Sequence, residues 1–231
     1  MVYGSGHDPA RSGTCWANYS FGRLIMRKIL AVLSCVPSVL LAQEKTTDSS
    51  GSNWSLSSSA FYYFLPDEEN LLNVVGSADH KSLHLEARYN YEDRKTLSAY
   101  AGWRFEAGKN FQFAATPMVG FATGNTDAFI PALELEASYK IFDFYSESEY
   151  LLDFESKENN FAYTWSELAI NPTDFLRLGI VAQRTRLYET EFDLQRGLLA
   201  QYSFWKLTAG AYYFNPFSND DFLSVSLSID F

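Results

Sequence analysis

The chain has 231 residues, of which 47% are apolar and 17% aromatic, and its formal net charge is −10. The acidic balance leaves no basic face for phosphates, so we expect no nucleic acid among its partners. Nothing in the sequence resembles a phosphate-binding glycine loop, a zinc-ligand set or an HExxH helix, so we expect neither a metal nor a cofactor.

The first predicted element is an export signal at residues 26–42. Arg27 and Lys28 precede the apolar run ILAVLSCVPSVLLA, which ends on the small residue Ala42 before a polar stretch. This order of basic, apolar and small residues predicts a secretory signal peptide that is cleaved after Ala42, and hence Sec-dependent export. The run is short and contains Pro37, which argues against a membrane-spanning helix.

Two further segments flank this signal. Residues 1–25 precede Met26 and are interpreted as an extension from a mis-assigned upstream start, whereas residues 43–52 form a polar, serine-rich tether. Both cysteines, Cys15 and Cys35, precede the predicted cleavage site. The exported chain would therefore contain no disulfide, although it leaves the cytoplasm.

From residue 53 onward the sequence alternates between apolar and polar residues, which is the period of a β-strand with one apolar face. Strands are predicted at 53–64, 69–77, 81–92, 95–106, 110–122, 128–141, 143–155, 161–171, 174–187, 190–203, 205–214 and 222–231. Turn-forming residues separate these runs, including the segment 76–81. The short run at 69–77 is the weakest. Since an antiparallel barrel with both ends on one side needs an even number of strands, ten strands are the alternative to twelve.

The polar faces of these strands carry charges of both signs. In LHLEARYNYE, for example, Leu85 and Ala87 alternate with Glu86 and Arg88. If the strands close into a barrel with the polar face inside, the candidate lumen-lining residues are Glu86, Arg88, Arg104, Glu134, Glu136, Lys140, Glu147, Glu149, Glu167 and Arg177.

Two closed barrels fit such alternation. A soluble barrel turns its apolar face inward, whereas a membrane barrel turns it outward into lipid. Aromatic residues gather near predicted strand ends, as at Trp103, Phe105, Phe142 and Phe204, and this placement suits two girdles at the membrane interfaces. Strands of about 10 to 13 residues also suit a tilted crossing of the hydrocarbon layer. The pattern therefore favours the membrane barrel.

The last predicted strand, LSVSLSIDF, places Leu223, Val225, Leu227, Ile229 and Phe231 on one face. This pattern resembles the C-terminal strand of bacterial outer-membrane β-barrels, which ends on an aromatic residue. The resemblance implies that the barrel-assembly machinery reads this strand and that the protein lies in outer-membrane lipid. We therefore predict an all-β fold, an antiparallel up-and-down transmembrane β-barrel over residues 53–231, with both ends in the periplasm.

Three functions remain open at this point. The favoured one is a small passive, porin-like channel for solutes or ions, with a charged lumen that prefers cations because carboxylates outnumber bases on the polar faces. The second is a closed structural or adhesion barrel with a salt-bridged interior. The third and weakest is a lipid-modifying enzyme that uses His84. No serine nucleophile motif accompanies this histidine, so we expect no enzyme.

Overall fold

The computed structural model describes residues 54–66, 68–185 and 193–231. The predicted upstream extension, signal peptide and tether lie outside these residues. No helix in the described part of the chain is long and apolar enough to cross a membrane.

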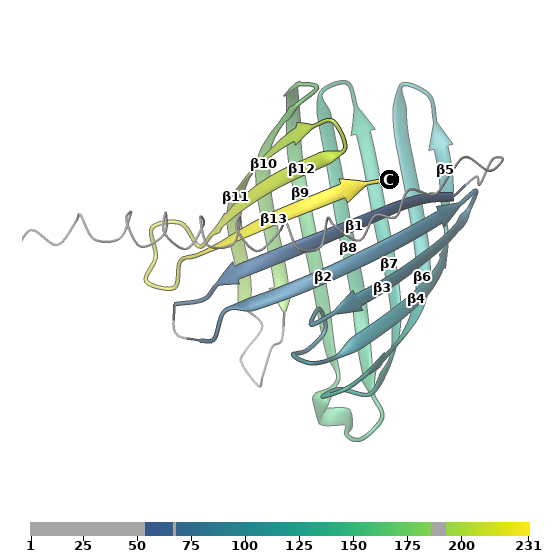
Figure 1. Cartoon of the computed structure of the whole chain (residues 1–231), viewed down its shortest axis with the longest axis vertical. Coiled ribbons are helices and arrows are strands. Elements are labelled where there is room, and N and C mark those ends of the chain that lie inside the picture. The colour runs from purple at the N-terminus through teal and green to yellow at the C-terminus, as the bar shows by residue number, and fades with distance from the viewer. Residues whose placement is uncertain (1–53, 67, 186–192) are drawn as a thin grey trace, which may run out of the picture. The chain divides into compact units, whose positions relative to one another are not determined.

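The described residues form one antiparallel sheet that curls into a barrel (Figure 1). Its strands are β1 (Trp54–Phe64), β2 (Leu71–His80), β3 (Leu83–Tyr89), β4 (Leu97–Trp103), β5 (Phe105–Gly108), β6 (Phe111–Thr123), β7 (Ala128–Tyr139), β8 (Phe142–Asp153), β9 (Phe161–Thr173), β10 (Leu176–Thr185), β11 (Asp193–Phe204), β12 (Leu207–Phe214) and β13 (Phe222–Asp230). A single 3-10 turn, η3 (Lys157–Asn159), lies between β8 and β9.

The barrel is closed and has twelve strands. β4 and β5 pair with β6 in one continuous register, Gly102 opposite Met118 and Phe105 opposite Ala115, so they form one strand. This strand is interrupted at Arg104, whose backbone N–H donates to the Ser82 carbonyl at 2.7 Å. β1 pairs with β13 along its length and completes the circle. The predicted twelve-stranded antiparallel barrel is confirmed, and the alternative of ten strands is wrong.

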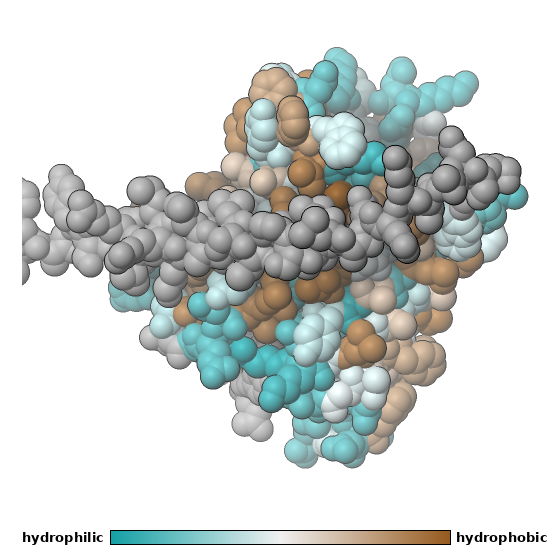
Figure 2. Space-filling view, viewed as in Figure 1, coloured by the Kyte–Doolittle hydropathy of each residue, from teal (hydrophilic) through white to brown (hydrophobic). Residues whose placement is uncertain are grey.

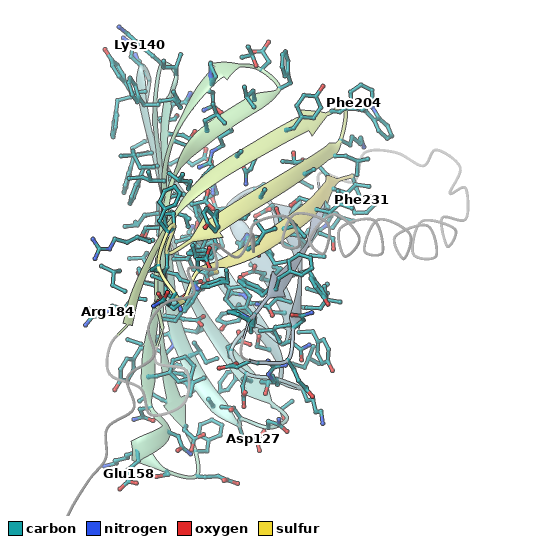
Figure 3. All side chains as sticks on the ribbon, turned by 90° about the vertical axis from the view of Figure 1, so that its left-hand side faces the viewer. Asp127, Lys140, Glu158, Arg184, Phe204 and Phe231 are labelled. Atoms are coloured by element: carbon teal, nitrogen blue, oxygen red, sulfur yellow. The ribbon has the colours of Figure 1, made fainter. Side chains whose placement is uncertain are left out.

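The connections differ between the two ends of the barrel. At one end, here called the short-turn end, strands are joined by the two-residue turns 81–82, 109–110, 140–141, 174–175 and 205–206. Lys81, Lys140 and Trp205 adopt the positive φ that tight hairpins need. The other, long-loop end holds the longer connections, with Asp127 and Glu158 there and Lys140 and Phe204 opposite (Figure 3). The first residue of β1 and the last of β13 both lie at the short-turn end.

One predicted turn is wrong. The segment 76–81 contains glycine, serine and aspartate, yet β2 continues to His80 and turns only at Lys81 and Ser82. It stays extended because it pairs on both sides, with Ser77 opposite Ser57 of β1 and opposite Glu86 of β3. Ladder hydrogen bonds to two neighbours outweigh a local turn preference.

The apolar faces of the strands point outward. Val119, Ile180 and Leu198 are 50%, 55% and 53% exposed, whereas the charged Arg88 is 1% exposed. Figure 2 shows hydrophobic side chains lying openly on the outer wall. Exposed aromatic side chains stand near the short-turn end (Trp103, Phe105, Phe111, Phe142, Tyr202, Phe204, Trp205) and near the long-loop end (Tyr89, Phe121, Tyr150). A surface of this kind suits lipid rather than water.

Candidate functional site in the barrel interior

The half of the interior nearer the long loops is filled by apolar side chains. One cluster contains Trp165, Val181, Leu199, Tyr212, Phe214 and Phe222, and a second contains Tyr100, Met118, Ala122, Ala128, Ile130 and Leu151. Rings from separate strands meet inside, since the Trp165 centroid on β9 lies 5.4 Å from that of Tyr212 on β12 and 6.3 Å from that of Phe61 on β1. These side chains take up much of the interior at this level.

Among these apolar side chains lies a buried ionic group centred on Arg88, here called the Arg88 cluster (Arg88, Glu86, Glu92, Glu147 and Glu149). The Arg88 guanidinium donates to Glu147 at 2.5 Å, to Glu86 at 2.7 Å and to Glu149 at 3.1 Å. Arg88 and Glu86 belong to β3, and the other two carboxylates belong to β8. One cation therefore links two strands across the interior.

Tyrosines complete the Arg88 cluster. The Tyr100 hydroxyl lies 2.7 Å from Glu92 and 3.0 Å from Glu149 and shares its one hydrogen between them, and the Tyr91 hydroxyl donates to Glu147 at 2.9 Å. The centroids of the same two rings lie 4.2 and 4.5 Å from the Arg88 guanidinium carbon, within cation–π range. Burial of a charge is tolerable when it is paired and hydrogen-bonded in this manner.

The half of the interior nearer the short turns is open and polar. A hollow of about 440 Å³, here called the vestibule, is lined by Arg104, Glu136, Asp143 and Tyr145 among others. Arg104 donates to both oxygens of Glu136, at 2.5 and 3.0 Å. The side chains of this pair are 27% and 41% exposed, so it is solvated rather than sealed.

A second ionic group in this half is centred on Arg177 of β10. Its guanidinium donates to Asp143 of β8, at 2.9 Å from Nε and 2.5 Å from Nη2, and also to Glu167 of β9. Gln201 of β11 accepts a further bond at 3.0 Å. Four adjacent strands are thus joined by one arginine on the inner face.

Where β1 meets β13 and β2, small hydroxyl groups make several of the inner contacts. Ser59 donates to Ser228 across the β1–β13 seam at 2.9 Å, and Ser57 and Ser77 are 2.7 Å apart across β1 and β2. Serine side chains occupy little volume, so this part of the wall leaves space in the interior for the side chains of the opposite wall.

The structure places the predicted lumen residues at four locations. Glu86, Arg88, Glu147 and Glu149 meet in the Arg88 cluster, whereas Arg104, Glu136, Glu167 and Arg177 form the pairs near the short turns. Glu134 lies between, where it accepts from the Tyr145 hydroxyl at 3.0 Å. Lys140 is apart from all of these, because it occupies the exposed β7–β8 turn with φ of 55°.

Sequence reasoning missed several interior groups. Glu92 ends the predicted strand 81–92 but lies in the loop 90–96, which folds its side chain inward, where it accepts from Ser98 at 2.6 Å. Tyr91 precedes it in the same loop. Asp143 follows the β7–β8 turn, and the period-two pattern that it shares with Glu147 and Glu149 could have identified it.

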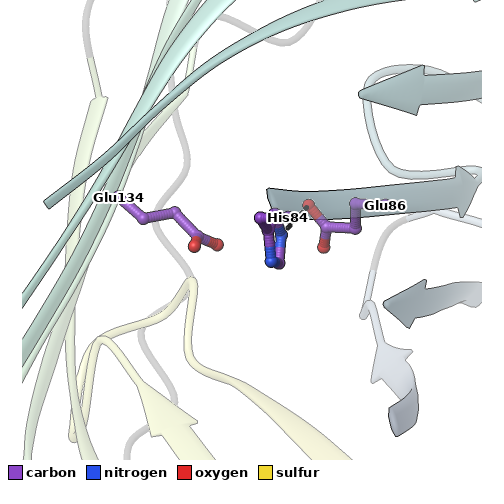
Figure 4. Close-up of side chains that lie close together, drawn as sticks. All are labelled: His84, Glu86 and Glu134. Carbon is purple, nitrogen blue, oxygen red and sulfur yellow. Dashed lines mark ion pairs between the residues drawn. The ribbon is translucent and has the colours of Figure 1, made fainter. Parts of the chain in front are cut away.

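His84 lies on the same inner face, near the start of β3 and the turn 81–82. Its Nδ1 is 2.7 Å from Asp79 of β2, and its Nε2 is 3.9 Å from Glu86. Figure 4 shows Glu134 reaching toward this pair from another part of the wall. In the described residues, neither ring nitrogen is hydrogen-bonded to a serine, which is the contact that a serine-based enzyme would need.

The alternating apolar residues of β13 point to the outside of the barrel. Leu223, Val225, Leu227 and Ile229 lie opposite outward residues of β1, and Phe231 is exposed beyond the strand at the short-turn end. The Phe231 backbone N–H still donates to the Leu56 carbonyl at 2.9 Å. This strand is therefore both one side of the closing seam and part of the apolar surface.

No protein-family model matches the sequence, and no curated protein matches it. Solved structures do resemble it. The KdgM porin superposes with a TM-score of 0.59 and 10% identity over 76% of this chain and 99% of its own. The structure described as the KdgM porin in complex with disordered oligogalacturonate gives the same values. The NanC porin gives a TM-score of 0.48 and 9% identity over 76% of this chain and 98% of its own. In its fold, this chain is a closed antiparallel β-barrel similar to that of the KdgM porin.

Proposed function

We propose that this protein is a small channel of the bacterial outer membrane, with a passage that is narrowest at the Arg88 cluster and the surrounding rings. The observation that carries the proposal is the inside-out arrangement of the barrel: outward Val119 and Leu198 are half exposed, whereas inward Arg88 is sealed. A barrel with an apolar exterior requires lipid around it, and twelve strands enclose more width than side chains alone need.

The vestibule supports the transport reading. Polar groups at Arg104, Glu136 and Asp143 line a hollow of about 440 Å³ that opens toward the short turns. We place this end in the periplasm, because tight turns and both strand termini face that side in such barrels. A solute would pass from the long loops, through the narrow region around the Arg88 cluster, into this vestibule.

The charge of the interior supports a preference for cations. The Arg88 cluster sets one guanidinium against the carboxylates of Glu86, Glu92, Glu147 and Glu149, and further carboxylates follow at Glu134 and Glu136. An excess of fixed negative charge attracts cations and repels anions. Oligogalacturonate, which the KdgM complex contains, carries a carboxylate on each sugar. We therefore do not expect this chain to share that solute.

A closed structural barrel is the second candidate, and the filled half of the interior favours it. Tyr212, Phe214, Ile130 and Leu151 are fully buried, so side chains crowd the interior at their level. Under this reading the ionic groups brace the wall, and contacts with other molecules occur through the long loops.

Conductance separates the two candidates. The full chain would be expressed with its export signal, and the folded barrel purified from outer membranes would be inserted into a planar bilayer across a KCl gradient. A channel gives discrete steps with a reversal potential of the sign expected for cation preference. Trp165→Ala removes a ring that touches strands β1 and β12, so it should enlarge the steps severalfold.

Trp103→Ala is the matched control, since Trp103 lies on the outer surface and is not part of the passage. Its steps should equal those of the wild type. If correctly folded wild-type and Trp165→Ala barrels both stay silent, the channel proposal fails and the structural barrel takes its place.

A further inference from the structure

The group around His84 has a feature that its hydrogen bonds leave unexplained. His84 is 9% exposed, and its Nε2 is buried without a hydrogen-bond partner. One ligand atom from each of His84, Glu86 and Glu134 lies within 4.8 Å of the others. A buried nitrogen without a partner is costly unless something binds it.

Asp79 prepares this nitrogen to bind a cation. Its carboxylate lies 2.7 Å from Nδ1 of His84, so the ring proton belongs on Nδ1 and the lone pair belongs on Nε2. A carboxylate behind a histidine, with the far nitrogen facing other donors, is the usual support of a metal-ligating imidazole. The far nitrogen of His84 faces Glu86 and Glu134 (Figure 4).

The carboxylates of Glu86 and Glu134 also have oxygen atoms that could bind a cation. Glu134 accepts from the Tyr145 hydroxyl through Oε1, and Glu86 accepts from Arg88 through Oε2, so each hydrogen bond occupies only one oxygen. Arg88 is already shared with Glu147 and Glu149. The region therefore holds more carboxylates than its guanidinium can neutralise, and a divalent cation would supply the missing positive charge.

We propose that His84, Glu86 and Glu134 bind one divalent first-row transition-metal ion, for which Zn²⁺ is the probe. Imidazole nitrogen with carboxylate oxygen is a ligand set for such ions, whereas Ca²⁺ and Mg²⁺ favour oxygen alone. Metal–ligand bonds of about 2.0 to 2.2 Å would draw the three atoms to roughly 3.3–3.5 Å from one another. Movement of the Glu134 side chain accomplishes most of this contraction.

The site would tie separate parts of the wall together. His84 and Glu86 belong to β3 and Glu134 belongs to β7, and these strands are separated in the sheet by β4 and β6. The inference does not rest on the channel proposal, because the ion binds to the folded barrel whether or not it conducts.

The test is metal binding by the folded full-length protein in detergent, after removal of metal with a chelator. Calorimetric titration with Zn²⁺ should give one ion per barrel, and Co²⁺ should give the absorption bands of a nitrogen–oxygen site. His84→Gln and Glu134→Gln should each weaken Zn²⁺ binding at least 10-fold. Asp79→Asn, which acts through His84, should weaken it about 10- to 100-fold.

Two variants serve as controls. His80→Gln alters the neighbouring histidine that stacks on Trp54 at 4.9 Å, and Glu136→Gln alters the next inward carboxylate of β7, which pairs with Arg104. Both should bind Zn²⁺ as the wild type does. Folding of each variant is checked by its migration on unboiled gels.

Binding that survives His84→Gln unchanged, or a folded wild type that takes up no Zn²⁺ at micromolar concentration, overturns the proposal. His84 would then be a protonated partner of Asp79 and Glu86. If His84→Gln does not fold, Glu134→Gln decides the question alone, since Glu134 is only partly buried.

Discussion

At Arg88, one guanidinium group that is 1% exposed holds carboxylates from two strands and a loop. Its hydrogen bonds to Glu86, Glu147 and Glu149 offset the cost of taking these charges out of water. Such a group contributes little net stability when it is complete. It becomes costly when one member is removed, because the remaining charges stay buried without a partner.

Arg88→Met should therefore lower the free energy of unfolding by about 3–5 kcal/mol. The carboxylates of Glu147 and Glu149 would remain buried beside an apolar side chain. Urea-induced unfolding of the barrel in lipid vesicles, followed by tryptophan fluorescence, measures the loss.

Arg104→Met is the matched control, since Arg104 pairs with Glu136 in the solvated vestibule. This substitution should lower the free energy of unfolding by less than about 1 kcal/mol, as for exposed ion pairs. Equal losses for the two variants would show that the Arg88 cluster is hydrated and that the passage is wider than the structure suggests.

Along a single strand, outward residues are exposed on the barrel surface, whereas inward residues pack in the interior. On β6, Val119 and Phe121 point outward, whereas Met118 and Ala122 pack inside the second apolar cluster. Phe111 is also outward but stands at the start of the strand, next to a tight turn. Val119 and Phe111 therefore share one face of β6 but would lie at different depths in a bilayer.

Val119→Arg should cost about 2–4 kcal/mol of unfolding free energy, because it places a charge near the middle of the hydrocarbon layer. Phe111→Arg should cost about 0–1 kcal/mol, beyond the packing of the lost ring, because the interface solvates the guanidinium. Both are measured by denaturant unfolding in lipid vesicles. A similar cost at the two positions would contradict the proposed membrane depth of β6.

Alternation predicted most strands and their faces, because it is a local pattern. The residues of one strand are enough to distinguish its apolar side from its polar side. The predictions that failed concerned features that depend on pairing with neighbouring strands. β2 continues through a segment rich in turn formers because β1 and β3 pair with it, and the strand around Arg104 breaks although its pattern is continuous. Similarly, alternation places Glu92 on the polar face of the predicted strand 81–92, but it could not indicate that this residue lies in a loop.

For the whole molecule, the number of strands followed from the sequence, but the state of the interior did not. Arg88 and Glu147 are 59 residues apart, and their contact depends on how far the strands are staggered around the barrel. The filling of the long-loop half similarly depends on rings from β1, β9 and β12 that meet only after closure. Charge predicted which residues lie inside but not which partners they find.

A closed sheet has no free edge for detergent to attack, so the folded barrel should resist SDS until it is heated. Unboiled samples should migrate on gels differently from boiled ones. A variant that lacks residues 222–231 has no β13 to pair with β1, and it should migrate identically before and after boiling. A full-length protein that shows no heat-dependent shift would contradict the closed barrel.

The β1–β13 seam also dictates the order of events in folding. Ser59 and Ser228, which are hydrogen-bonded across it, are 169 residues apart in the chain, so the pairing is among the most non-local contacts that the molecule contains. Loop-closure entropy opposes such contacts until the intervening strands are in place. β1 consequently cannot complete its pairing until β13 is available. The barrel therefore closes last at this seam, and until it closes the sheet has two open edges beside an apolar face.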